Sequence, residues 1–101
     1  MFTGNAALLD ACVLAILKRG HTYGYELTQK VKEVIDVSES SLYPVLRRLQ
    51  KDNYLYTYDE AVNGRNRRYY SITKSGQKKL EQYAKEWREY KKNIDEILGG
   101  K

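Results

Sequence analysis

The stretch that decides the fold lies at positions 40–49 and reads Ser-Ser-Leu-Tyr-Pro-Val-Leu-Arg-Arg-Leu. Its apolar residues recur with helical spacing and share one side of a helix. They are Leu42, Val45, Leu46 and Leu49. The opposite side presents Ser40, Tyr43 and Arg47, flanked by Ser41, Pro44 and Arg48. A short helix with an apolar inner stripe and a basic, tyrosine-bearing outer face is typical of a helix that enters the major groove of DNA.

Because of Pro44, the sequence does not decide at which residue this helix begins. A proline is tolerated in the first turn of a helix but costs about 3 kcal/mol in the interior. Either Ser40 or Ser41 therefore caps the helix, or the helix begins near Ser38 and bends. The other end is predicted at Asn53, because asparagine accepts the left-handed backbone that often ends a helix.

A tight β-hairpin is predicted after this helix. Residues 54–60 and 67–73 alternate in the manner of strands, and Asn63-Gly64 between them favours a turn with positive φ at both positions. Leu55 and Thr57 share one face of the first strand. One face of the second strand carries Arg68, Tyr70 and Ile72. The tip is rich in arginine and contains Arg65, Asn66 and Arg67.

Two further helices are predicted before the opening stretch. The apolar stripe of the first consists of Leu9, Cys12, Val13, Ile16 and Leu17. Thr22 is expected to cap the second, whose stripe consists of Tyr23, Leu27, Val31, Val34 and Ile35. Gly24 lies on the side of this stripe and allows close approach of a neighbour, whereas Tyr25 points away. Three helices and a hairpin predict a winged helix-turn-helix, mainly α with a small β-hairpin.

A long last helix follows, with Thr73 as its expected cap. Its apolar residues are spaced three and four apart, which is a heptad pattern. They are Leu80, Tyr83, Trp87, Tyr90, Ile94 and Ile97. A second copy of the same helix is the simplest cover for this seam, and the alternative is that the helix folds back on its own domain. We therefore expect a DNA-binding domain at 1–76 and a dimerisation helix at 77–101.

The net charge of +5 is concentrated in one part of the chain. Residues 1–46 carry a net charge of −1, residues 47–79 carry +6, and residues 80–101 carry zero. A localised basic region favours phosphate through the release of condensed counterions, so double-stranded DNA is the expected partner. The alternative is a winged-helix module for protein–protein interaction, which need have no affinity for DNA.

The cysteine, histidine and apolar content argue against other classes of protein. The single cysteine rules out an intramolecular disulfide and fits a cytoplasmic location, and Cys12 is expected to be a packed, inert thiol. The apolar run at 6–17 is broken by Asp10 and is too short to span a bilayer, so no membrane partner is expected. His21 has no histidine or cysteine companion that would build a metal site or a nucleophile–base pair, so we expect no metal, no cofactor and no enzymatic activity.

Three motifs resemble PadR-like transcriptional regulators. They are His21–Leu27, which is similar to the opening of that family's second helix, Ser41–Leu49, which is similar to its recognition helix, and Arg67–Thr73 followed by Gly76, which is similar to its second wing strand and exit. The resemblance runs from about Leu9 to Leu98. One departure is Asn53, where the family usually has glycine. The single C-terminal helix is similar to that of the family's short subgroup.

The resemblance implies a dimeric regulator, usually a repressor, that binds a palindromic operator. The residues that the motifs and the resemblance together assign to DNA are Tyr25, Ser40, Ser41, Tyr43, Pro44, Arg47, Arg65, Asn66 and Arg67. Some short members bind flat aromatic or cationic drugs on a tryptophan of the last helix. Trp87 has a matching place, so the resemblance also implies a planar aromatic or cationic effector.

Overall fold

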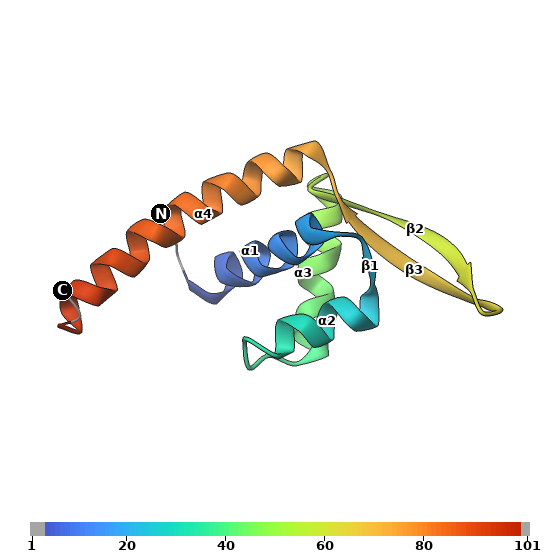
Figure 1. The fold of residues 1–101 in the computed structure, drawn as a ribbon, viewed down its shortest axis with the longest axis horizontal. Coiled ribbons are helices and arrows are strands. Elements are labelled where there is room, and N and C mark those ends of the chain that lie inside the picture. The colour runs from blue at the N-terminus through green and yellow to red at the C-terminus, as the bar shows by residue number, and fades with distance from the viewer. Residues whose placement is uncertain (1–3, 100–101) are drawn as a thin grey trace.

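The computed structural model describes residues 4–99, which form four helices and three strands (Figure 1). In chain order these are α1 (Gly4–Arg19), β1 (Thr22–Tyr23), α2 (Gly24–Lys32), α3 (Glu39–Lys51), β2 (Leu55–Val62), β3 (Arg65–Ile72) and α4 (Lys74–Ile97). Helix α1 lies between α4 and α2, and the β2–β3 hairpin projects to one side as a wing. This is the expected winged helix-turn-helix with an added C-terminal helix.

The sheet has one strand more than expected. Its order is β1-β3-β2, and both contacts are antiparallel. Thr22 pairs with Tyr70 and Tyr23 pairs with Tyr69, so Thr22 lies in a strand and does not cap a helix. Helix α2 begins instead at Gly24, after Tyr23, whose side chain makes no capping hydrogen bond. The expectation that Thr22 starts the second helix is therefore wrong.

The predicted hairpin turn is confirmed. Asn63 and Gly64 have φ angles of 52° and 78°, and Val62 pairs with Arg65 across a two-residue loop. Both strands run two residues closer to the tip than the alternation predicted. The register places Leu55 opposite Ile72 and keeps both on the side of the core.

Ten apolar side chains from α1, α2, α3 and β2 form the buried core. They are Leu9, Val13, Leu14, Leu17, Leu27, Val31, Leu42, Leu46, Leu49 and Leu55. Leu14 lies outside the predicted stripe and is buried because α1 contacts α2, α3 and α4 together. Val34 was predicted in the core but is 78% exposed, because α2 ends at Lys32.

The start of α3 is set by Ser38. Its hydroxyl oxygen accepts a hydrogen bond from the Ser41 backbone N–H at 3.2 Å, and the helix begins at Glu39. Pro44 lies inside the helix, so of the two predicted starts the earlier one is correct. The expected end is also correct, since Asn53 has a φ of 66° directly after the last turn.

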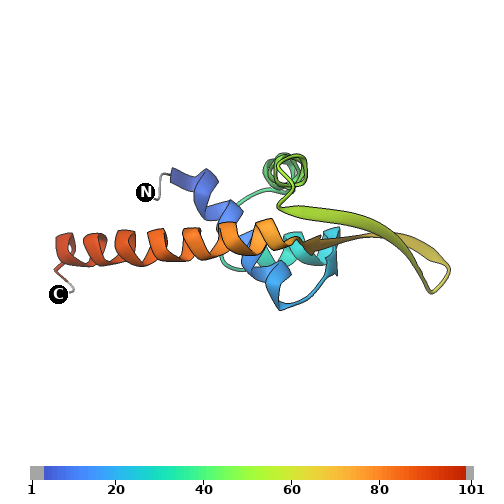
Figure 2. The ribbon, with the colours of Figure 1, turned by 90° about the horizontal axis from the view of Figure 1, so that it is seen from above.

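Helix α4 is fastened to the wing at its first turn. The Thr73 hydroxyl accepts a hydrogen bond from the Gly76 N–H at 2.9 Å and donates one to the Asn53 carbonyl at 2.7 Å. Leu80 and Tyr83 pack against the core of the same chain. Beyond them α4 continues past the rest of the domain, and the whole chain measures 54 × 26 × 21 Å (Figure 2). Ile97, near its end, is 79% exposed.

Candidate nucleic-acid interface

The outer face of α3 is an exposed, hydrogen-bonding surface. The predicted groove-facing side chains Ser40, Ser41, Tyr43, Pro44 and Arg47 all lie on it and are all exposed. Because Leu42, Leu46 and Leu49 are buried on the opposite side, the orientation of the helix is fixed by its own core. The face therefore offers a tyrosine hydroxyl, two serine hydroxyls and a guanidinium to a partner.

The wing brings two residues near this face, Tyr70 and Arg68, that the sequence prediction did not select. Burial raises the pKa of the Tyr70 hydroxyl, whereas the nearby guanidinium groups of Arg68 and Arg47 lower it. Tyr43 acts on the same hydroxyl, so Tyr70 lies within electrostatic range of the outer face of α3. Arg68 is exposed, and its Nε lies 3.5 Å from the Asp59 carboxylate. Arg68 of the wing and Arg47 of α3 thus both lie within electrostatic range of the Tyr70 hydroxyl.

The other residues predicted to contact DNA lie together beside the start of α2. They are Tyr25, Arg65, Asn66 and Arg67. A shallow cleft of about 430 Å³ is lined by Tyr23, Tyr25, Arg65, Asn66 and Arg67. The Arg67 guanidinium lies over the Tyr23 ring, 4.4 Å from its centroid, and its Nε is buried without a hydrogen-bond partner among the described residues. Tyr25 and the wing tip therefore form one basic, aromatic-walled cleft.

An aromatic cluster continues from this cleft toward the base of the wing. The Tyr58 and Tyr69 rings are nearly parallel with centroids 5.6 Å apart, and His21 stacks on Tyr58 at 5.8 Å. The His21 Nδ1 is also hydrogen-bonded to the Tyr58 hydroxyl. The histidine is thus part of an aromatic stack. Within the part of the chain that the structure describes, no three side chains form a group that could hold a metal ion.

A different kind of surface lies between α1, the end of α2 and α4. It is an apolar groove of about 460 Å³ that contains Trp87 at its α4 wall. The other lining residues are Leu8, Ala11, Cys12, Ala15, Val34, Ile35, Leu80, Tyr83 and Ala84. Trp87 is 40% exposed, and its ring centroid lies 6.1 Å from that of Tyr90. Burial raises the pKa of the Cys12 thiol in this wall, which keeps the sulfur protonated.

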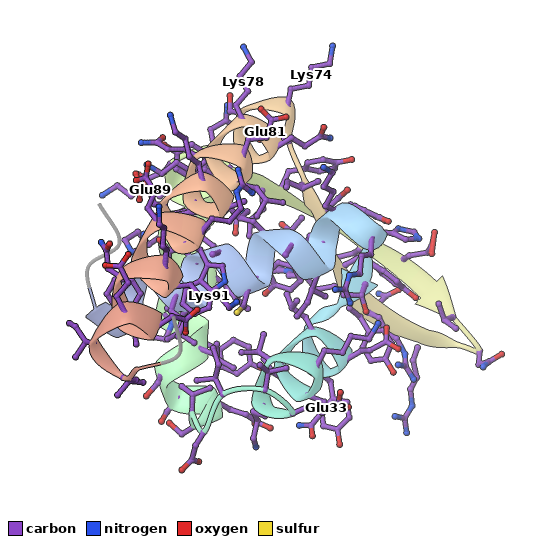
Figure 3. The ribbon with its side chains drawn as sticks, turned by 60° about the vertical axis from the view of Figure 1, so that its left-hand side comes forward. Glu33, Lys74, Lys78, Glu81, Glu89 and Lys91 are labelled. Atoms are coloured by element: carbon purple, nitrogen blue, oxygen red, sulfur yellow. The ribbon has the colours of Figure 1, made fainter. Side chains whose placement is uncertain are left out.

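The outward side of α4 is charged. Figure 3 shows Lys74 and Lys78 projecting away from the domain at the first turns of this helix. Apolar α4 side chains lie on the other side, where Leu80 and Tyr83 meet the core. Among residues 4–99 no helix has the length and apolarity needed to cross a membrane.

The sequence of this chain also matches the model of a known family. The model of the transcriptional regulator PadR-like family covers residues 13–82. The chain belongs to the PadR-like family of transcriptional regulators. Its PadR-like fold includes the outer face of α3, the wing and the first part of α4, so the candidate DNA surface lies within the matched region. Members of this family are not enzymes.

Known relatives match between 77% and 99% of this chain. A transcriptional regulator of Mycobacterium tuberculosis, Rv3488, is 35% identical over 79 residues, which are 77% of this chain and 71% of that protein. The crystal structure of smu.1704 from Streptococcus mutans is 42% identical, covers 99% of this chain and 95% of its own, and superposes with a TM-score of 0.89. A PadR-like transcriptional regulator from Bacillus cereus, BC4206, is 34% identical over 93% of this chain and 94% of its own, with a TM-score of 0.84. The prediction of a PadR-like, DNA-binding regulator is therefore confirmed.

Proposed function

We propose that this PadR-like protein is a repressor that binds a palindromic operator as a homodimer and is released by a planar aromatic or cationic molecule. The observation that carries the DNA-binding part is the exposed outer face of α3, held outward by its buried leucines. A helix with these properties fits the major groove, and a two-fold dimer presents two such helices to a two-fold symmetric site.

The two groups of predicted residues suit different contacts. Tyr43 and Arg47 lie along the α3 face where base edges would lie, and arginine reads guanine through two parallel hydrogen bonds. Ser40, Ser41 and Pro44 surround them near the start of α3. The cleft residues Tyr25, Arg65, Asn66 and Arg67 combine two guanidiniums with a hydroxyl and an amide, which suits phosphates or the minor groove.

The second half of α4 is the proposed dimer contact. Leu80 and Tyr83 already contact their own core, so the first half of the predicted seam is covered within the chain. Trp87, Tyr90 and Ile97 retain large exposed areas, and Ile94 lies between Tyr90 and Ile97 in the heptad pattern. These heptad positions would pack against the same helix of a second copy.

The dimer has a direct test. Replacing Tyr90 and Ile94 together with Asp places two charges in the seam, which should give monomers in sedimentation and a large loss of operator affinity. Replacing the exposed Lys85 with Asp on the same helix is the control for added charge. A wild-type chain that sediments as a monomer at tens of micromolar, which is an ordinary range for interface strengths, would overturn the dimer proposal.

The apolar groove at Trp87 is the proposed effector site. Its volume of about 460 Å³ lies in the range of pockets for drug-sized ligands. A planar ring can stack on the indole, and a cation is attracted to its face. A molecule held there would lie against α4 and α1 and would change how the two DNA-binding domains are spaced.

Operator binding is tested by selecting genomic fragments on the immobilised protein and searching them for a palindrome. The affinity of a selected fragment should fall steeply as salt rises, because phosphate contacts release counterions. A protein-interaction module would instead show no affinity for duplex DNA. Effector binding is tested separately, since Trp87 is the sole tryptophan and saturable quenching by rhodamine 6G or another planar dye reports on its groove.

A further inference from the structure

A buried carboxylate joins the recognition helix to the helix that we propose forms the dimer. Asp10 of α1 is 3% exposed. Its Oδ2 accepts hydrogen bonds from Arg48 Nη1 at 3.0 Å and from the Tyr83 hydroxyl at 3.0 Å, and its Oδ1 accepts one from Arg48 Nη2 at 2.5 Å. Arg48 belongs to α3 and Tyr83 belongs to α4. One side chain of α1 thus holds both helices.

The sequence placed Arg48 at the edge of the DNA-facing side, and the structure pairs it with Asp10 while its side chain stays 45% exposed. Two parallel hydrogen bonds from a planar guanidinium to a carboxylate fix the angle between the groups as well as their distance. A carboxylate that is buried must be paired, and the Arg48 guanidinium supplies this pairing for Asp10. Arg48 is therefore tied to α1.

The Tyr83 hydroxyl is the third member of this network and keeps the proton that it donates to Asp10. Burial raises the pKa of the Tyr83 hydroxyl, and the Asp10 carboxylate raises it further. The Asp10 hydrogen bond in turn raises the pKa of Arg48. The hydroxyl and the guanidinium thus keep their protons at physiological pH and both donate to Asp10. The Tyr83 ring also lines the Trp87 groove, so the same side chain contacts the proposed effector site.

We propose that Asp10, through Arg48 and Tyr83, is a positioning residue that fixes the angle between α3 and α4. This inference rests on the proposed α4 dimer. In such a dimer the angle between α3 and α4 sets the separation of the two recognition helices, and this separation must match the spacing of the operator half-sites. The network thus makes the protein selective for half-site spacing.

The variant Tyr83→Phe tests this assignment. It keeps the ring in the groove and removes only the hydroxyl that donates to Asp10. The measured quantity is the ratio of affinities for a selected operator and for the same half-sites moved by one base pair. Partial unfolding would lower both affinities equally and leave the ratio unchanged. We expect the ratio to fall about tenfold, because a hydrogen bond to a charged group is being removed.

Two further variants sharpen the test. Arg48→Lys keeps the charge but loses the paired hydrogen bonds, so it should lower the same ratio. Tyr56→Phe removes an exposed hydroxyl of β2 outside the network and should leave the ratio as in the wild type. Unchanged spacing selectivity in both Tyr83→Phe and Arg48→Lys would overturn the inference.

A second measurement needs no operator. A spin label at Arg47→Cys in a Cys12→Ala background reports the distance between the two α3 helices of the free dimer. The distance distribution should be narrow in the otherwise unaltered protein and broaden when Tyr83→Phe is added. If the distance distribution of the Tyr83→Phe protein is unchanged, the inference is refuted, even if DNA binding fails. If the distribution broadens but the protein does not bind DNA, only the repressor proposal is refuted. A monomeric protein would overturn both.

Discussion

Replacing Gly76 with alanine should destabilise the fold, although helix propensity alone predicts the opposite. Gly76 is the third residue of α4 and is buried where the helix leaves the wing. A Cβ built on its backbone would lie 2.0 Å from the Tyr54 carbonyl oxygen and 2.7 Å from Ile72 Cγ1. The first of these contacts is with backbone, so rotation of a side chain cannot relieve it.

The size of the expected destabilisation follows from the backbone shift that the alanine Cβ would require. Alanine gains about 1 kcal/mol over glycine inside a helix. An ordinary carbon–oxygen contact is about 3.3 Å, so Tyr54 and α4 would have to separate by roughly 1.3 Å. That shift breaks the hydrogen bond from the Thr73 N–H to the Tyr54 carbonyl, which is 3.1 Å long. A lost hydrogen bond and overpacking each cost about 1–3 kcal/mol, so after the gain from alanine we expect a net loss of about 1–5 kcal/mol in the free energy of unfolding.

Urea unfolding at one fixed protein concentration measures this loss, because the stability of a dimer depends on concentration. With a slope of about 1.5 kcal/mol per molar, the midpoint of Gly76→Ala should fall by roughly 0.7–3.3 M. Ser75→Ala is the matched control, since Ser75 precedes Gly76 in the helix but is exposed, and its midpoint should change by less than about 0.5 M. A Gly76→Ala midpoint equal to or above that of the wild type would refute the steric reasoning.

Three further predictions concern function and reactivity. Tyr43→Ala and Arg47→Ala should each cost on the order of 1–3 kcal/mol of operator binding and relax specificity in gel-shift titrations, whereas unchanged binding would mean that the orientation of α3 toward DNA is wrong. Arg67→Ala should weaken all DNA sequences alike and reduce the salt slope by about one, and a loss confined to the operator would instead assign base contacts to the cleft. Cys12 should react with a neutral disulfide reagent more slowly than free cysteine at pH 8, since burial raises its pKa; a rate at or above that of cysteine would contradict a packed thiol.

The features that could be predicted from the sequence are those decided by a few neighbouring residues. Asn63-Gly64 takes the two positive φ angles of a tight turn because both residues tolerate them, wherever the hairpin lies in the fold. Asn53 ends α3 for the same local reason. Thr73 caps α4 because its hydroxyl reaches the N–H three residues later, a contact made within one turn.

The features that were missed depend on distant partners. The β1 strand has two residues, and they adopt strand pairing because β3 presents a free edge beside them. The sequence left the start of α3 undecided because three of the four residues at 38–41 are serines, and each of them can cap a helix. Ser38 is the cap in the structure, although this places Pro44 beyond the first turn. Arg48 pairs with Asp10, which lies thirty-eight residues earlier in the chain and is buried beside it.

The placement of the wing arginines could have been derived more fully from the same sequence. Side chains alternate along a strand, so Arg68 shares a face with Tyr70 and Ile72, as the pattern indicated. Ile72 packs on the core, so Arg68 lies on the core-side face of β3. Arg67, one residue earlier, has the opposite parity and meets Tyr23. A shift of one residue in the pairing of β2 with β3 would exchange these two arginines, so the tight Asn63-Gly64 turn determines which arginine shares a face with Ile72 and which meets Tyr23.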